Sequence, residues 1–237
     1  MIPHPSLLRR FLLATQLGVF ILMASSPAIA EALQLDFSEE KALENQWETF
    51  FSSGPVELER IYSTEGDPLL RKSGGGEVSL RPLKWNPDES IQSISVTFRS
   101  LPLQNAGSIG IWLGDDAATN SGILGMIRIV SPDEVDMRIY PPTSPREIRT
   151  SEPESHQFRT SRPIHKQEYL TVRLAYKSEG TKKLLELSLF SARTGEVLAS
   201  LSRETGADLF QRIPFAGVRI AGQTFLLQEF STIAAIP

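Results

Sequence analysis

Two carboxylates alternate with apolar residues in the stretch "PDEVDMRIY" at residues 132–140. In an extended strand, Glu134 and Asp136 lie on one face, because successive side chains point to opposite faces. Two carboxyl groups about 5–5.5 Å apart can cleave a glycosidic bond with retention of configuration, one as nucleophile and one as acid. The residues that follow are Arg138 and Ile139, and neither can donate a proton to a glycosidic oxygen at neutral pH. This stretch therefore offers no further proton donor after the two acids.

The face that carries these acids has two interpretations. Alternation predicts an amphipathic strand whose charged face is solvated, with Arg138 paired with Asp136 or Glu134. The same face is also a candidate ligand-binding surface, because acids and an arginine hydrogen-bond hydroxyl groups and an aromatic ring stacks on a sugar. The candidate ligand-binding residues are Trp112, Glu134, Asp136, Arg138 and Tyr140.

A second polar cluster lies in "WLGDDAATNSG" at residues 112–122. Asp115, Asp116 and Asn120 offer the oxygen ligands that Ca²⁺ prefers, so they are the candidate metal ligands and Ca²⁺ the one candidate cofactor. Asp, Asn, Thr, Ser and Gly are also the residues from which turns are made. A strand end followed by a turn is therefore the alternative, and no metal-loop spacing favours the metal.

The N-terminus has the pattern of a secretory signal peptide. Arg9 and Arg10 precede an uncharged apolar run at residues 11–23, and "SSPAIA" follows with small residues at the positions that a signal peptidase reads. The run has 13 residues, whereas a membrane-spanning helix needs about 20. We expect cleavage after Ala30 and a secreted or periplasmic protein, with no later stretch apolar enough to span a bilayer.

Charge and cysteine content limit the partners. Removal of residues 1–30, which hold two arginines and no acid, moves the net charge from −4 to −6. That charge argues against a nucleic-acid partner, which would need a basic face. The chain has no cysteine, which excludes disulfides, thiolate metal sites and a lipid anchor on an N-terminal cysteine. A large exported chain without cysteine is more typical of a bacterial protein.

The elements that must position these residues are strands. Apolar residues alternate with polar ones in "SISVTFRSL" (residues 93–101), "YLTVRLAY" (169–176) and "KLLELSLFSA" (183–192). Gly180 and Gly195 lie in predicted hairpin turns between such stretches. Many short strands and tight turns predict an all-β, antiparallel two-sheet sandwich formed by one domain at residues 31–237. Short helical turns are expected only within residues 38–46 and 204–212.

Residues 141–167 do not fit the strand pattern, because they are polar and include five prolines. A loop of that length is uncommon inside a compact domain. The segment therefore either contains an edge strand, with "HQFRTS" at residues 156–161 as the candidate, or drapes over the sandwich as a loop.

Five stretches carry a resemblance to a known fold family. They are "LDFSEEKALENQW", then "SIQSISVTFRSL" with "GSIGIWLGDD", then residues 169–201, and finally "FAGVRIAGQTFLLQEFSTIAAIP". In this order they resemble the opening strand, the paired central strands, the late meander and the closing strand beside the first in concanavalin A-like lectin and glucanase jelly rolls. The resemblance implies a jelly-roll sandwich, and lectins of this fold bind Ca²⁺ through Asp and Asn oxygens beside the sugar.

Glucanases of this fold carry Glu-x-Asp-x-x-Glu or Glu-x-Asp-x-Glu on one strand, with the last glutamate as general acid. Glu134 and Asp136 match the first two positions, and Arg138 or Ile139 stands at the third. We therefore expect a non-catalytic protein that binds polysaccharide or glycan. One alternative is a divergent glycoside hydrolase or polysaccharide lyase that takes its acid from another strand, for example Glu77 or Glu186. The other is a structural cell-envelope protein that binds protein partners.

Overall fold

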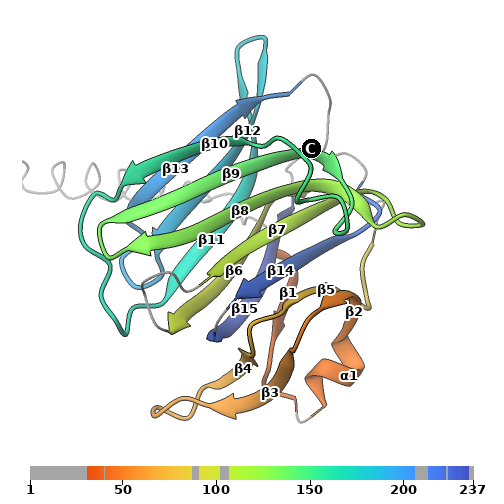
Figure 1. Cartoon of the computed structure of the whole chain (residues 1–237), viewed down its shortest axis with the longest axis vertical. Helices are drawn as coiled ribbons and strands as arrows, with labels where there is room; N and C mark the ends of the chain where they lie inside the picture. The colour runs from red at the N-terminus through yellow and green to blue at the C-terminus, as the bar shows by residue number, and fades with distance from the viewer. Residues whose placement is uncertain are drawn as a thin grey trace, which may run out of the picture. The chain divides into compact units, whose positions relative to one another are not determined.

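Two antiparallel β-sheets pack face to face around an apolar core, as the alternation predicts (Figure 1). The computed structural model describes residues 31–39, 41–86, 91–101, 107–205, 213–222 and 224–234. The predicted signal peptide at residues 1–30 and most of the second predicted helical turn lie outside them. The first predicted turn is present as helix α1 (Ala42–Gln46). In the described part of the chain, no helix has the length and hydropathy to cross a bilayer.

One sheet has eight strands in the order β13-β12-β11-β6-β15-β4-β3, with β1 also paired to β15. Its strands are β1 (Glu31–Asp36), β3 (Glu57–Tyr62), β4 (Pro68–Ser73), β6 (Ile91–Leu101), β11 (Leu170–Glu179), β12 (Lys182–Ser191), β13 (Val197–Glu204) and β15 (Thr224–Ala234).

The other sheet has seven strands in the order β10-β9-β8-β7-β14-β5-β2. Its strands are β2 (Trp47–Ser53), β5 (Glu77–Pro82), β7 (Gly107–Asp116), β8 (Ser121–Ser131), β9 (Glu134–Thr143), β10 (Glu154–Arg159) and β14 (Ala216–Gly222).

The core forms because every long strand places alternate residues inward. The eight-stranded sheet contributes Val96, Val172 and Leu187, among others, and the seven-stranded sheet contributes Ile111, Ile127 and Met137. These side chains are nearly inaccessible to solvent, so the alternating acids and arginines of the seven-stranded sheet must face outward. That outer face is where the candidate ligand-binding residues lie.

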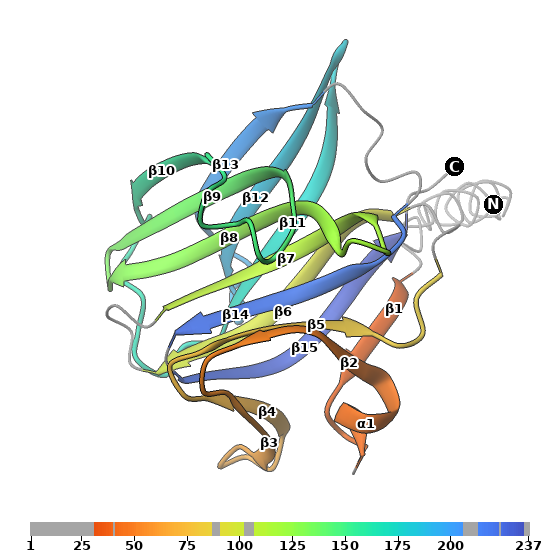
Figure 2. The ribbon, with the colours of Figure 1, turned by 45° about the vertical axis from the view of Figure 1, so that its right-hand side comes forward.

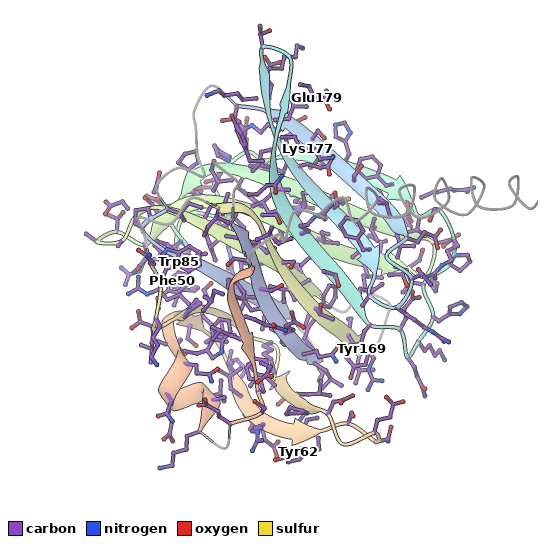
Figure 3. All side chains as sticks on the ribbon, turned by 180° about the vertical axis from the view of Figure 1, so that it is seen from behind. Phe50, Tyr62, Trp85, Tyr169, Lys177 and Glu179 are labelled. Atoms are coloured by element: carbon purple, nitrogen blue, oxygen red, sulfur yellow. The ribbon has the colours of Figure 1, made fainter. Side chains whose placement is uncertain are left out.

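The late meander and the closing strand are where the resemblance places them. Strands β11, β12 and β13 are consecutive neighbours, and β15 pairs with β1. Gly180 and Gly195, at the two predicted hairpin turns, have positive φ values of 62° and 70°, a conformation that glycine adopts without steric cost. Figure 3 shows the first of these hairpins, with Lys177 and Glu179 near its tip, as a projection from the rest of the strands.

The predicted pairing of the two central strands is wrong. β6 pairs with β11 and β15 in the eight-stranded sheet, whereas β7 pairs with β8 and β14 in the seven-stranded sheet. Both strands contribute inward side chains to the same core cluster. Placing them in opposite sheets lets each strand bury its apolar face against the other sheet.

Residues 141–167 contain both structures that the sequence left open. β10 (Glu154–Arg159) pairs with β9 and forms the edge of the seven-stranded sheet. The segment before it, residues 144–153, runs back across the front of β9 and β8 (Figures 1 and 2). This segment, which we call the cover loop, determines how much of the outer face is open.

Candidate functional site

The outer face of the seven-stranded sheet carries ordered rows of side chains across its strands. In one row the partners are, in succession, Asp136 on β9, Arg128 on β8, Ser108 on β7, Ala221 on β14 and Glu77 on β5. Neighbouring strands lie about 4.8 Å apart, so four steps place Asp136 and Glu77 roughly 19 Å apart. The two acids therefore occupy opposite sides of the same face.

The two aromatic candidates lie in a closed apolar cluster on this face. Trp112 is fully buried and Tyr140 is 5% exposed. The cluster that contains them consists of Trp112, Leu124, Met126, Tyr140, Ile148 and Phe215. Ile148 comes from the cover loop, so this loop contributes to the cluster in which both rings are buried. The indole N–H of Trp112 donates a hydrogen bond to the Ser79 hydroxyl at 3.2 Å.

The charged candidates on β9 are paired with each other. The Arg138 guanidinium donates to Asp136 from Nη2 at 2.5 Å and from Nε at 3.0 Å. Hydrogen bonds to Asp136 and Tyr140 raise the pKa of Arg138 above its ordinary value. Glu134, at the start of β9, is half-buried and stands opposite Arg159 of β10. The structure thus brings together Asp136, Arg138 and Tyr140. Glu134 lies at the end of the same strand, and Trp112 lies two strands away on β7.

The three candidate metal ligands take part in the turn between β7 and β8. Asp115 accepts a hydrogen bond from the Ser121 hydroxyl at 2.6 Å. Asp116 accepts from the backbone N–H two residues later, and the pKa of its carboxyl is lowered chiefly by that bond. Asn120 adopts a positive φ of 54°, and its Oδ1 accepts from Arg81 at 3.1 Å. Among the described residues, no three His, Cys, Asp or Glu side chains are grouped to hold a metal ion.

A β-bulge in β2 turns two consecutive aromatic residues toward the outer face. Thr49 pairs with Leu80 and Phe51 with Ser79, so Phe50 is the extra residue. Both phenylalanines are half-buried and line the same hollow. Sequence reasoning missed them, although two adjacent aromatic residues in "WETFFSS" interrupt the period of two and are a signal for a bulge.

The hollow beside β2, which we call the β2 hollow, lies between β2, β5 and the cover loop. Its volume is about 540 Å³, within the range of roughly 300–1,000 Å³ that is usual for ligand pockets. It is lined by Phe50, Phe51, Ser52, Ser53, Glu77, Pro145, Arg146 and Arg149. Smaller hollows of about 350 and 320 Å³ share some of these residues, so the depression is elongated.

The acid in the wall of the β2 hollow is held by a buried arginine. Arg219 Nε donates to Glu77 Oε1 at 2.7 Å, and the two residues are 7% and 8% exposed. A second nitrogen of Arg219 donates to the Ser108 hydroxyl at 2.9 Å. The Glu77 charge is therefore neutralised by a neighbouring side chain on the same face of the sheet.

A buried lysine fixes one end of this depression. Lys72 Nζ donates to the carbonyl oxygens of Gly74 and Gly76 at 2.7 Å each, and also to that of Gly222. Burial lowers the pKa of Lys72. The ammonium ties the glycine turn between β4 and β5 to the end of β14, which keeps the rim in place.

Internal hydrogen bonds and one apolar anchor hold the cover loop. The Glu147 carboxylate accepts from the Ser144 hydroxyl at 2.8 Å, and the Thr150 amide donates to the Glu147 carbonyl at 2.9 Å. Ile148 is buried in the cluster over Trp112. The two arginines that flank this anchor region, Arg146 and Arg149, are exposed and line the β2 hollow.

Comparison with known proteins gives a match in structure only. No protein-family model matches the sequence, and a search of curated proteins finds no relative. A legume lectin-like domain from Entamoeba histolytica is similar with a TM-score of 0.56 and 13% identity, over 88% of this chain and 100% of that domain. An endo-1,3-beta-glucanase from Streptomyces sioyaensis is similar with a TM-score of 0.54 and 10% identity, over 89% of this chain and 98% of that enzyme. The fold is the concanavalin A-like jelly roll.

Lectin-like domains and glucanases are thus both among the structures that this jelly roll resembles. At these identities the likeness establishes the fold alone, since one fold carries many activities. The choice between binding and hydrolysis must therefore rest on the side chains of this chain. The β2 hollow, which is lined by aromatic, acidic and basic side chains, is the candidate site.

Proposed function

We propose that this is an exported, non-catalytic protein that binds a polysaccharide or glycan in the β2 hollow. The observation that carries the proposal is the hollow itself, in which the bulge at Phe50 adds two aromatic rings to a polar wall. Aromatic rings bury the apolar faces of sugar rings, while serine hydroxyls and charged groups hydrogen-bond the sugar hydroxyls. Jelly rolls of lectin-like domains provide a fold-level parallel.

The placement of acids supports binding rather than cleavage. Two carboxyl groups must flank one glycosidic bond at about 5–10 Å. Asp136 and Glu77 are roughly 19 Å apart across the sheet, and each accepts hydrogen bonds from a different arginine. The other alternative acid, Glu186, lies on β12 of the opposite sheet and pairs with Lys177 at 2.6 Å.

Binding to a polysaccharide panel tests the proposal. Affinity electrophoresis and calorimetry with β-glucans, xylans and pectic polysaccharides should find at least one ligand. Phe51→Ala should then weaken binding by about tenfold, equivalent to roughly 1.4 kcal/mol of lost ring contact. Tyr62→Ala is the matched control, because Tyr62 is an aromatic residue that is 59% exposed on β3 of the other sheet. Absence of binding to every member of the panel would refute the proposal.

A second candidate is a hydrolase or lyase that acts in the same hollow. The observation in its favour is Glu77, a buried acid in the wall of a ligand-sized hollow. The test is whether the protein turns over any polysaccharide that it binds. If it does, and if Glu77→Gln abolishes this turnover but retains binding, the hydrolase or lyase would replace the binding proposal.

A further inference from the structure

The charges around the β2 hollow point to an acidic ligand. We propose that the hollow takes an acidic polysaccharide and that Arg146 and Arg149 bind the carboxylate of a uronic acid residue. This inference rests on the proposed function and specifies the class of sugar. It follows from the balance of charges, the stiffness of the cover loop and the aromatic wall.

The first step is the balance of charges. The hollow is lined by one acid, Glu77, and that acid is already neutralised by Arg219 at 2.7 Å. Arg146 and Arg149 have no acidic partner among the residues that the structure describes. The hollow therefore carries two unmatched positive charges, in a chain whose net charge is −4. This local excess opposes the sign of the whole protein and favours an anion.

The second step is preorganisation. Arg146 and Arg149 are three residues apart in a turn whose backbone is fixed by the bonds around Glu147. Ile148, between them, is 6% exposed and is held in the apolar cluster. A loop that is ordered before binding loses less entropy when it captures a ligand. Guanidinium groups also pair with carboxylates through two parallel hydrogen bonds, a geometry that a lysine ammonium does not provide.

The third step is the match to a sugar rather than a small anion. Phe50 and Phe51 line the same hollow as the two arginines, and the volume of about 540 Å³ exceeds what one carboxylate needs. A uronic acid residue combines a ring face for the phenylalanines with a carboxylate for the arginines. The neighbouring hollows leave space for residues on either side of it.

The experiment compares hexagalacturonate with its fully methyl-esterified form, in which each charged carboxylate is replaced by a neutral methyl ester on the same sugar backbone. Calorimetry on the full chain should show at least tenfold tighter binding of the acid, and this difference should shrink as salt is added. Arg146→Gln and Arg149→Gln should each weaken binding of the acid by about tenfold, while binding of the ester changes less than twofold. Arg193→Gln, at an exposed position in the turn between β12 and β13, is the matched control. Thermal melts establish that each variant is folded.

Each other outcome has a defined meaning. Equal binding of acid and ester, unaffected by the two substitutions, would overturn the acidic-ligand inference and leave the proposed function intact. Binding of neither form, with neutral β-glucans also inactive, would overturn both. Tighter binding of a sulfated galactan than of hexagalacturonate would overturn the assignment to a carboxylate.

Discussion

Arg219 and Glu77 are 142 residues apart in the chain and form a buried ion pair in which Nε of the arginine lies 2.7 Å from Oε1 of the glutamate. The pair joins β14 to β5 at the edge of the β2 hollow, where both residues line the adjoining hollow. It removes the one negative charge that would otherwise offset Arg146 and Arg149. The same contact therefore supports the sheet and sets the charge of the candidate site.

Removal of one member of this pair should destabilise the protein strongly. Arg219→Met leaves the Glu77 carboxylate buried without a counter-charge, and we expect the free energy of unfolding to fall by about 3 kcal/mol. Urea denaturation measures the change. The double variant with Glu77→Gln should regain at least half of the loss. A double variant no more stable than Arg219→Met would show that burial of the unpaired charge is not the cause.

Truncation of Ile148 should uncover the tryptophan beneath the cover loop. Ile148→Ala is expected to cost about 2–4 kcal/mol of stability and to expose Trp112 to solvent. Acrylamide quenching of tryptophan fluorescence should increase in the folded variant, whereas Ile148→Val should behave almost as the parent does. Unchanged quenching in the alanine variant would mean that Ile148 does not shield the indole.

Stability should depend on pH through Glu168. Hydrogen bonds from the Arg162 guanidinium lower the pKa of the Glu168 carboxyl from 4.5 to about 2. Between these values the unfolded chain binds more protons than the folded one, so the free energy of unfolding decreases as the pH falls from 4.5 toward 2. Chemical denaturation across this pH range should show a smaller decrease in the free energy of unfolding for Glu168→Gln than for the unsubstituted protein. Glu152→Gln, at an exposed loop position, is the control that should keep the decrease of the parent.

Export should remove the N-terminal segment. We expect the chain, expressed with residues 1–30 in a Gram-negative host, to appear in the periplasm and to begin at Glu31. Intact-mass analysis and N-terminal sequencing of the fractionated protein test this directly. Replacement of Ala30 with Gln should slow cleavage. Retention of the uncleaved, unsubstituted chain in the cytoplasm would contradict the prediction.

The fold class followed from local chemistry, because alternation along a strand is dictated by the pleat and needs no knowledge of the partner strand. Residues 93–101, 169–176 and 183–192 were therefore recognisable as strands of a sandwich. The departure from the glucanase pattern was equally local, since Arg138 and Ile139 occupy the positions where that pattern has its last glutamate. Side-chain type and order along the chain decide both features.

Contacts between segments that are distant in the chain decided which residues make up the candidate site. Alternation does not specify which sheet a strand joins, so the separation of β6 from β7 emerged only when both apolar faces were buried in one core. Trp112 was recognisable as a candidate ligand-binding residue, but it is buried in a cluster that includes Ile148 from the cover loop. The sequence by itself determined a sandwich whose acids are too few for the glucanase pattern. Tertiary structure alone decided that the outer face carries the β2 hollow, because packing sets which side chains reach solvent.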